Sequence, residues 1–284
     1  MTMIAVTGAS GYLGGEIVRL LKESGRKVIA VGRTSGDFLC NLDDEQEVAV
    51  MVNTLRPDSI IHCAAVVPSN HDAYSDNVAA EYSLKLIQNL VAASPKHIVF
   101  TSSMTVYRAD QTMPVSEDDA LEPEAGYGGG KRRAEVLLAK SSGNTTVLRF
   151  PGLFGGVRKD GLLYNIAQAF SRGQVPRLPE KPPLWGALHV NDAARICIAA
   201  SEKRNNGRSL ILNAGYPNVQ ATHLAVEALA KRFGCSVPGM SIGPLFQMNV
   251  ERVKKVLGRD FGDWNRRLDE LVDAVLNEEK QHDQ

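Results

Sequence analysis

Short apolar segments alternate with longer amphipathic segments through the first three quarters of the chain. In residues 12–24, for example, Leu13, Ile17 and Leu20 recur at helical spacing and share one face. The apolar segments have the length and composition of buried strands. The pattern predicts strands at 2–7, 27–31, 38–40, 59–63, 97–102, 145–150 and 209–213, and helices at 12–24, 45–55, 77–93, 126–140, 162–172, 193–200, 221–233 and 249–257.

This alternation indicates an α/β fold with a doubly wound parallel sheet. Strands that alternate with helices form βαβ units, and these build a parallel sheet with helices on both faces. The sequence changes character at residues 151–183, which are rich in glycine and proline. We therefore expect a dinucleotide-binding domain at 1–150, rejoined by about 184–213. A smaller substrate-binding lobe would comprise 151–183 and 214–284, with a polar tail from Glu278 that frays.

Composition is typical of a soluble globular protein. Of the 284 residues 44% are hydrophobic, and 32 Lys and Arg balance 32 Asp and Glu. A neutral chain lacks the basic excess that favours binding to nucleic acid or to anionic membranes. The N-terminus does not resemble a signal peptide, and no apolar run approaches the length of about 20 residues that spans a membrane. We expect a cytoplasmic protein whose partner is a small-molecule substrate.

The cysteines indicate no metal site. Cys40, Cys63, Cys197 and Cys235 are widely separated and form neither a CxxC pair nor a cluster with histidine. Reduced structural thiols fit this distribution and a cytoplasmic location.

A glycine-rich turn, Thr7-Gly-Ala-Ser-Gly-Tyr-Leu-Gly14, follows the first predicted strand and opens the first predicted helix. Gly8 would allow a tight turn, Gly11 a close approach to a pyrophosphate, and Gly14 close packing of the helix on the sheet. The N-terminus of the helix offers unpaired N–H groups to phosphates. Glycines placed in this way on strand, turn and helix predict a dinucleotide site.

The end of the second predicted strand bears on which dinucleotide binds. Arg33 stands where a carboxylate would bond the adenosine ribose of NAD. A guanidinium suits a 2′-phosphate and can stack on adenine, so NADP is favoured. Asp37 lies nearby in the sequence and keeps NAD possible.

Tyr127 and Lys131 lie four residues apart, on one face of a predicted helix. A nearby cation favours the phenolate, so we expect Lys131 to lower the pKa of Tyr127. Such a phenol can move a proton at a carbonyl or an alcohol. Tyrosine and lysine fall at this spacing by chance in many helices, and the pair gains meaning from the dinucleotide turn.

Hydroxyl side chains gather in residues 101–105, directly after the strand predicted at 97–102. The carboxyl ends of parallel strands face the ligand crevice. Ser103 would hold a substrate oxygen there, beside the phenol of Tyr127. Serine and threonine clusters are otherwise common as turns and helix caps.

Together these motifs resemble the extended short-chain dehydrogenase/reductase superfamily, and within it the NAD-dependent epimerase/dehydratase family, with a Rossmann fold. In the first half of the chain, dTDP-4-dehydrorhamnose reductases are the most similar members. Residues 7–14 resemble the family's TGxxGxxG motif, and residues 55–65 its kPDvViHlAA strand. Ser103 matches the catalytic hydroxyl, and Tyr127 with Lys131 matches the YxxxK pair. Residues 147–150 resemble the LR strand, and 188–192 the hVdD turn.

The resemblance implies roles for these residues. Tyr127 would exchange a proton with the substrate oxygen, Lys131 would hold the nicotinamide ribose, and Ser103 would bond the reacting oxygen. Dimerisation through the helices at 77–93 and 126–140 is also implied. The implied cofactor contacts are Gly8, Ser10, Gly11, Tyr12, Leu13, Gly14, Arg33, Asn41, Leu42, Ala64, Ala65, Lys131 and Pro151, with Asn77 behind the site.

Several positions depart from the family's pattern. Gly152 stands where many sugar-nucleotide members have an asparagine that contacts substrate, and residues 184–188 lack the cation that holds a diphosphate. Arg158, Lys159 or Arg177 could substitute for that cation. Trp185 would either stack on a ring or pack between the lobes.

The three glycines between Tyr127 and Lys131 also replace the usual YGxSK pattern. We hypothesise that the missing side chains let the cofactor or a neighbouring helix approach closely.

These observations favour an NAD(P)-dependent oxidoreductase or epimerase that transfers hydride at a carbonyl or alcohol carbon of a sugar or nucleotide-sugar. Met104 stands where dehydratases carry an acidic residue, which argues against dehydration. Reduction of small non-sugar carbonyl compounds is one alternative, and it agrees with the missing diphosphate contacts. A non-catalytic dinucleotide-binding sensor is another, although loss of Tyr127 or Lys131 would be expected in such a protein.

Overall fold

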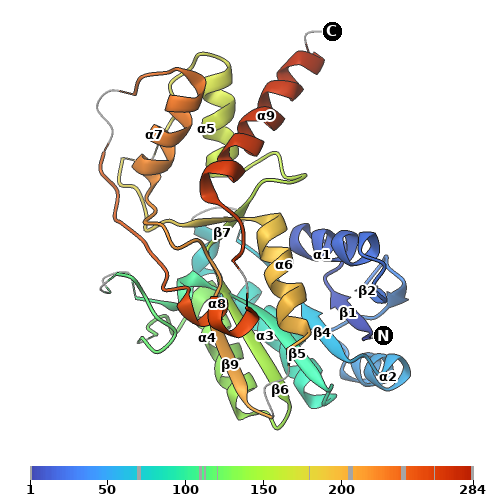
Figure 1. The fold of residues 1–284 in the computed structure, drawn as a ribbon. Coiled ribbons are helices and arrows are strands. Elements are labelled where there is room, and N and C mark those ends of the chain that lie inside the picture. The colour runs from blue at the N-terminus through green and yellow to red at the C-terminus, as the bar shows by residue number, and fades with distance from the viewer. Residues whose placement is uncertain are drawn as a thin grey trace.

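A seven-stranded parallel sheet forms the centre of the protein (Figure 1). The computed structural model describes residues 2–68, 72–108, 111, 113–119, 121–178, 180–203, 207–237, 241–258 and 260–282. The strand order is β3-β2-β1-β4-β5-β6-β9, and every pair of neighbours is parallel. The strands are β1 (Ile4–Thr7), β2 (Val28–Gly32), β3 (Phe38–Leu39), β4 (Ser59–His62), β5 (His97–Ser103), β6 (Asn144–Phe150) and β9 (Ser209–Asn213).

The strand order reverses between β1 and β4. From β1 the chain proceeds outward to β2 and β3, and then returns to place β4, β5, β6 and β9 on the other side of β1. In doubly wound sheets, ligands bind at the carboxyl ends of the strands at such a switch point. The predicted doubly wound α/β fold is confirmed, and its switch point lies beside the glycine-rich turn.

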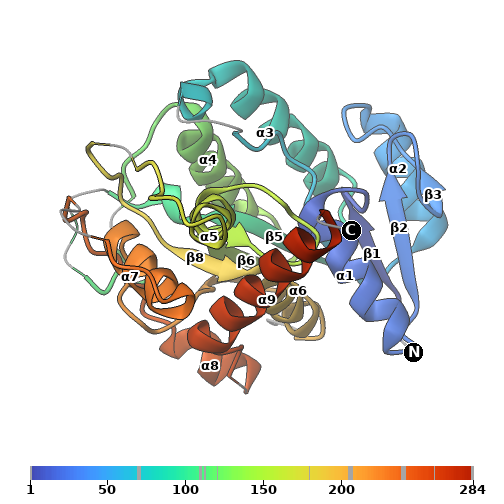
Figure 2. The same ribbon diagram turned by 90° about the horizontal axis from the view of Figure 1, so that it is seen from above.

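Helices cover both faces of the sheet (Figure 2). One apolar core is shared by the sheet and α2 (Glu45–Leu55), α3 (Asn77–Ala92) and α4 (Gly126–Lys140). The other face packs on α1 (Tyr12–Glu23) and α6 (Val190–Ser201). Two short 3-10 helices, η1 (Asp72–Ser75) and η2 (Met104–Val106), contact α4.

A group of three helices lies beyond the sheet, at the top of Figure 1: α5 (Leu162–Ser171), α7 (Thr222–Phe233) and α9 (Trp264–His282). Its apolar core is continuous with the core on the α1 and α6 face. A two-stranded parallel sheet of β7 (Gly152–Phe154) and β8 (Ala187–His189) lies between, and α8 (Glu251–Leu257) contacts β9 and α6. We retain the division into a dinucleotide-binding domain and a substrate lobe as a proposal.

Five of the described elements were not predicted from the sequence, namely β7, β8, α9 and the 3-10 helices η1 and η2. The two strands have three residues each and lie in or beside the segment rich in glycine and proline. The expectation of a frayed tail from Glu278 was wrong, because α9 continues to His282. The Glu278 carboxylate accepts a hydrogen bond from the Tyr164 hydroxyl at 2.7 Å and pairs with Lys159 at 3.2 Å, which holds the end of the helix.

A buried ion pair joins α4 to the middle of the sheet. The Arg149 guanidinium on β6 donates to both oxygens of Glu135 on α4, at distances from 2.7 to 3.2 Å, and both side chains are almost fully buried. Glu135 also accepts a 2.5 Å bond from the Ser102 hydroxyl on β5. One carboxylate therefore connects α4, β5 and β6 directly beneath the strand ends.

Candidate active site

The glycine-rich turn has the tight packing predicted for it. Gly8 has φ +68°, and a Cβ there would lie 2.7 Å from the backbone nitrogen of Ala64. A Cβ on Gly14 would collide with the carbonyl oxygen of Gly8. Only glycine lets β1, the end of β4 and the first turn of α1 approach one another this closely.

The N-terminus of α1 suits the phosphates of a dinucleotide. Gly11 is the N-cap residue and provides no side-chain hydrogen bond to the first turn. The N–H groups of that turn therefore remain available, together with the partial positive charge of the helix end. Ser10, Gly11 and Tyr12 line one hollow with Arg158 and Lys159, and Glu16 and Asp160 line it too. Arg158 is paired with Asp160 and Lys159 with Glu278, so the fit to a pyrophosphate rests on the N–H groups of the helix end.

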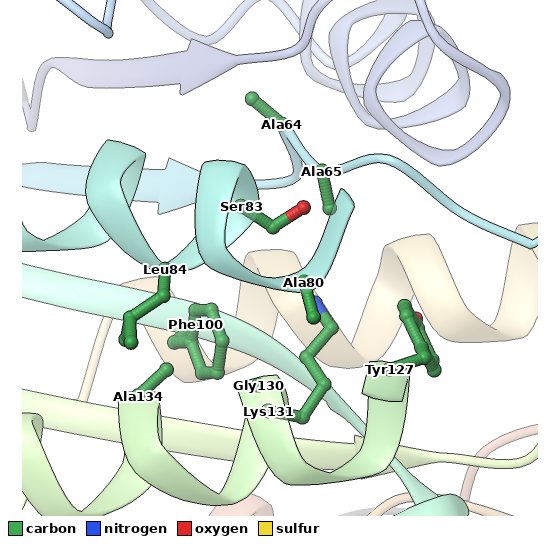
Figure 3. Close-up of a pocket in the computed structure, with 10 residues that line it drawn as sticks. All are labelled: Ala64, Ala65, Ala80, Ser83, Leu84, Phe100, Tyr127, Gly130, Lys131 and Ala134. Carbon is green, nitrogen blue, oxygen red and sulfur yellow. The ribbon is translucent and has the colours of Figure 1, made fainter. Parts of the chain in front are cut away.

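Tyr127 and Lys131 project from the same face of α4, as Figure 3 shows. The Lys131 side chain is only 6% exposed, and its ammonium donates a 2.7 Å hydrogen bond to the Thr101 carbonyl oxygen. The ammonium lies 4.7 Å from the centre of the Phe100 ring and 5.5 Å from the centre of the Tyr127 ring. Burial lowers the pKa of Lys131 to about 8, while Cys63 and Glu135 act in the opposite direction.

The expected lowering of the Tyr127 pKa is wrong for this structure. Burial raises the pKa of the Tyr127 phenol, and the neighbouring phenol of Tyr74 adds to the rise. The Tyr74 and Tyr127 rings meet edge to face, with centres 5.8 Å apart. The Lys131 ammonium donates to the Thr101 carbonyl, and burial is the main cause of the raised pKa of Tyr127. The phenol therefore keeps its proton at neutral pH.

Ser103 is the last residue of β5 and caps η2. Its side-chain oxygen accepts hydrogen bonds from the backbone N–H of Thr105 at 3.2 Å and from the Thr105 hydroxyl at 3.0 Å. The side chain is nearly buried, with the residue 8% exposed. Ser103, which we expect to hold substrate, is thus also a helix cap, the alternative that the sequence analysis left open.

The three glycines of α4 allow three different close contacts. A Cβ on Gly128 would lie 2.5 Å from the Thr105 carbonyl oxygen, and one on Gly129 would lie 2.5 Å from the Glu124 carbonyl carbon. A Cβ on Gly130 would lie 3.0 Å from the methyl group of Ala80 on α3. The hypothesis of a closely approaching helix therefore holds at Gly130. At Gly129 the close neighbour is the preceding backbone.

A small cavity lies between α3, α4 and the end of β4. Ala64, Ala65 and Ala80 line it together with Tyr127 and Lys131 (Figure 3). Asn77 accepts a 2.7 Å bond from the backbone N–H of Gly126, which ties the start of α3 to the start of α4. The residues predicted from β4 are thus brought against the Tyr127–Lys131 pair.

Of the candidate cofactor residues near β2, one is exposed and others accept hydrogen bonds from the backbone. Arg33 is exposed beyond the end of β2. The Asp37 carboxylate accepts a 2.8 Å bond from the backbone N–H of Ala30, which makes it part of the turn. The Asn41 side-chain oxygen accepts from the N–H of Asp43 at 3.3 Å, and Leu42 is buried.

Other candidates have structural contacts. The Trp185 ring meets Trp264 at 6.4 Å between centres, which agrees with the expectation that it packs between the lobes. His189 caps α6 by accepting from the N–H of Asn191. The buried Pro151 follows β6 directly. Within the described ranges no group of three His, Cys, Asp or Glu side chains is suited to a metal ion, and no helix there is long and apolar enough to cross a membrane.

Tyr74 and Glu135 were not predicted from the sequence, and Ser102 and Thr105 were noted only as members of the hydroxyl cluster at 101–105. Glu135 lies one helical turn after Lys131, which places it on the buried face of α4. Its spacing from Lys131 was the only local signal, because its partner Arg149 is on a distant strand. Tyr74 lies in η1 and is brought to Tyr127 only by the fold.

The chain is similar in sequence to one protein family and to several individual proteins. A model of the NAD dependent epimerase/dehydratase family matches residues 4–215. The chain is 31% identical over 161 residues to the spore coat polysaccharide biosynthesis protein SpsK of Bacillus subtilis, covering 55% of this chain and 54% of that protein. It is 29% identical over 215 residues to methionine adenosyltransferase 2 subunit beta of Xenopus laevis, and the match covers 70% of this chain and 62% of that protein. It is 26% identical to UDP-glucose 4-epimerase of Azospirillum brasilense, and the match covers 99% of this chain and 93% of that protein.

Solved structures share the fold over the full length. UDP-glucose 4-epimerase from Thermotoga maritima, solved with UDP-glucose, matches with a TM-score of 0.79 at 21% identity, covering 99% of this chain and 100% of that chain. WbmG of Bordetella bronchiseptica, solved with NAD and UDP, matches with a TM-score of 0.78 at 15% identity, and the match covers 97% of this chain and 95% of that chain. By contrast, the chain spans about half the length of SpsK, with 54% of that protein covered.

The glycine contacts predict the effect of a methyl group inside α4. We expect Gly129→Ala to lower the free energy of unfolding by roughly 1–3 kcal/mol, because the new Cβ would overlap the Glu124 backbone. The matched control is Gly15→Ala in α1, where the nearest atom is at an ordinary 3.5 Å. That control should gain up to about 1 kcal/mol from helix propensity. Urea denaturation measures both, and parent-like stability of Gly129→Ala would contradict the packing described.

Proposed function

Because the chain belongs to the NAD dependent epimerase/dehydratase family, we propose that it is an NAD(P)-dependent oxidoreductase or epimerase. It acts at a carbonyl or alcohol carbon of a sugar or nucleotide-sugar. The family resemblance inferred from the motifs is confirmed by the model match over residues 4–215. The observation that carries the proposal is the position of the Tyr127 ring 5.5 Å from the buried ammonium of Lys131, in a cavity that Ala64 and Ala65 also line.

The residues divide the chemistry between them. When bound, the dinucleotide supplies or accepts the hydride. Tyr127 delivers a proton to the substrate oxygen on reduction and removes it on oxidation. Lys131 holds the nicotinamide ribose through its ammonium. Ser103 donates a hydrogen bond to the reacting oxygen, and Tyr12 with Leu13, in the first turn of α1, presents N–H groups to the pyrophosphate.

Relatives support the sugar class of substrate. SpsK is named for polysaccharide biosynthesis, and two other matches are UDP-glucose 4-epimerases, one of them solved with UDP-glucose. WbmG was solved with NAD and UDP together. The position of Met104 next to Ser103 argues against dehydration, which leaves reduction and epimerisation as the two candidate outcomes.

A second reading is a non-catalytic dinucleotide-binding protein. It is favoured by the similarity to methionine adenosyltransferase 2 subunit beta, whose name describes a subunit of another enzyme. Retention of both Tyr127 and Lys131 favours catalysis instead. Reduction of small non-sugar carbonyl compounds remains an alternative for the same site. A cytoplasmic location and a homodimer formed through α3 and α4 belong to the proposal as expectations.

Replacement of the phenol tests the assignment of the proton donor. We expect Tyr127→Phe to lower turnover by about 10²–10⁴-fold, because it removes one O–H group while keeping the ring that meets Tyr74. The assays are interconversion of UDP-glucose and UDP-galactose and NADPH-dependent reduction of a nucleotide-linked 4-ketosugar. Calorimetry should show that NADPH affinity is unchanged.

Turnover of Tyr127→Phe at the parent rate would overturn the catalytic assignment. If the parent protein binds the dinucleotide but turns over neither probe, and UDP-glucose causes no absorbance change at the nicotinamide, the non-catalytic reading is supported instead.

Cofactor choice is tested at Arg33. We expect NADPH to bind more tightly than NADH, and Arg33→Ala to weaken NADPH binding about tenfold while leaving NADH binding unchanged, since only NADPH carries the 2′-phosphate. Arg26→Ala is the control, because Arg26 precedes the amino end of β2 and pairs with Glu202. Tenfold tighter binding of NADH by the parent would refute the preference.

A further inference from the structure

We propose that Thr105 is a positioning residue that presents the Ser103 hydroxyl proton to the substrate oxygen. The inference rests on the proposed function and assigns a task to a side chain that none of the sequence motifs singled out. It follows from the number of hydrogen bonds that the Ser103 oxygen accepts.

A serine hydroxyl has two acceptor lone pairs and one donor proton. The Ser103 oxygen accepts from the Thr105 backbone N–H at 3.2 Å and from the Thr105 hydroxyl at 3.0 Å. Both lone pairs are therefore occupied by one residue. With the Thr105 hydroxyl as the donor in this pair, the remaining capacity of Ser103 is to donate its own proton.

A donor is what the reaction needs at this position. A substrate carbonyl oxygen gains negative charge as hydride arrives, and a preoriented O–H group aimed at that oxygen stabilises the charge. Two hydrogen bonds accepted by the Ser103 oxygen also polarise its O–H bond, which makes it a stronger donor. Thr105 thereby fixes the direction in which Ser103 acts.

Thr105 also sets where Ser103 lies relative to α4. The Thr105 carbonyl oxygen sits so close to Gly128 that a Cβ there would be 2.5 Å away. Gly128 directly follows Tyr127 in the first turn of α4. The segment from Ser103 to Thr105 is thus held against the turn that carries the proposed proton donor, at the carboxyl end of β5.

An ordinary helix cap accounts for only one of the two hydrogen bonds. Ser103 is the N-cap residue of η2, and a cap requires the backbone N–H of Thr105 alone. The bond from the Thr105 hydroxyl is additional. Valine has the shape of threonine and keeps the backbone N–H, so Thr105→Val removes this one bond and retains the cap.

The test is a double-mutant cycle with the UDP-glucose and 4-ketosugar assays. We expect Thr105→Val to lower kcat about tenfold, the effect of about one hydrogen bond, with unchanged calorimetric affinity for NADPH. Thr105→Ser should restore kcat, because it returns the hydroxyl. In the Ser103→Ala background Thr105→Val should cause no further loss, since its target oxygen is absent.

The matched control is Thr222→Val. Thr222 is 1% exposed, and its hydroxyl oxygen has no hydrogen-bond partner among the residues that the structure describes. This variant also exchanges a buried hydroxyl for a methyl group, far along the chain in α7, and should leave kcat at the parent value. Thermal unfolding of each variant verifies that it is folded.

The outcomes separate this inference from the proposed function. If the parent protein turns over neither probe, the proposed function fails. If Ser103→Ala and Tyr127→Phe both turn over at the parent rate, the catalytic roles of these two residues fail, and the positioning role fails with them. The positioning role is refuted if those variants are impaired but the kcat of Thr105→Val equals that of the parent. It is also refuted if adding Thr105→Val lowers the kcat of Ser103→Ala by the same factor as it lowers the kcat of the parent. Failure of Thr105→Ser to restore kcat would also count against it.

Discussion

The candidate site depends on the burial of one ammonium group. Lys131 is enclosed by the Phe100 and Tyr127 rings, and the Thr101 carbonyl accepts its hydrogen bond. Removing a cation from water is costly unless it is compensated, so its pKa falls to about 8. A group with this pKa stays charged at neutral pH yet is sensitive to small changes in its surroundings. Burial also raises the pKa of the Tyr127 phenol above its ordinary value.

The rest of the fold holds this arrangement in place. Glu135 receives hydrogen bonds from Ser102 and Arg149, which fixes α4 against β5 and β6. Arg149 also donates to the Tyr107 hydroxyl at 2.9 Å, and Tyr107 donates to Asn213 on β9 at 2.6 Å. Removing one partner of such a buried pair typically costs about 3–5 kcal/mol. The polar network therefore fixes the relative positions of Ser103 and Tyr127, which lie on different elements.

Sequence reasoning was most successful where signals are local. The predicted range 126–140 is reproduced by α4, and Gly8 and Gly14 have the close packing predicted for them, because both depend on neighbouring residues. It failed where distant segments decide the outcome. The pKa of Tyr127 was predicted in the wrong direction, because spacing reveals the cation but not the loss of water. The interaction of Asp37 with Ala30, and the pairing of β7 with β8, likewise depend on contacts that no local pattern encodes.

The pH dependence of NADPH affinity tests the central claim most directly. With Lys131 as the charged group that holds the cofactor, affinity should be constant near pH 7 and fall by about tenfold for each unit above a pH of about 8, as the ammonium loses its proton. Below that pH the group is charged in free and bound protein alike. In Lys131→Met, calorimetry should give weaker binding with no such dependence. An affinity for the parent protein that stays constant from pH 7 to about 9.5 would contradict the account.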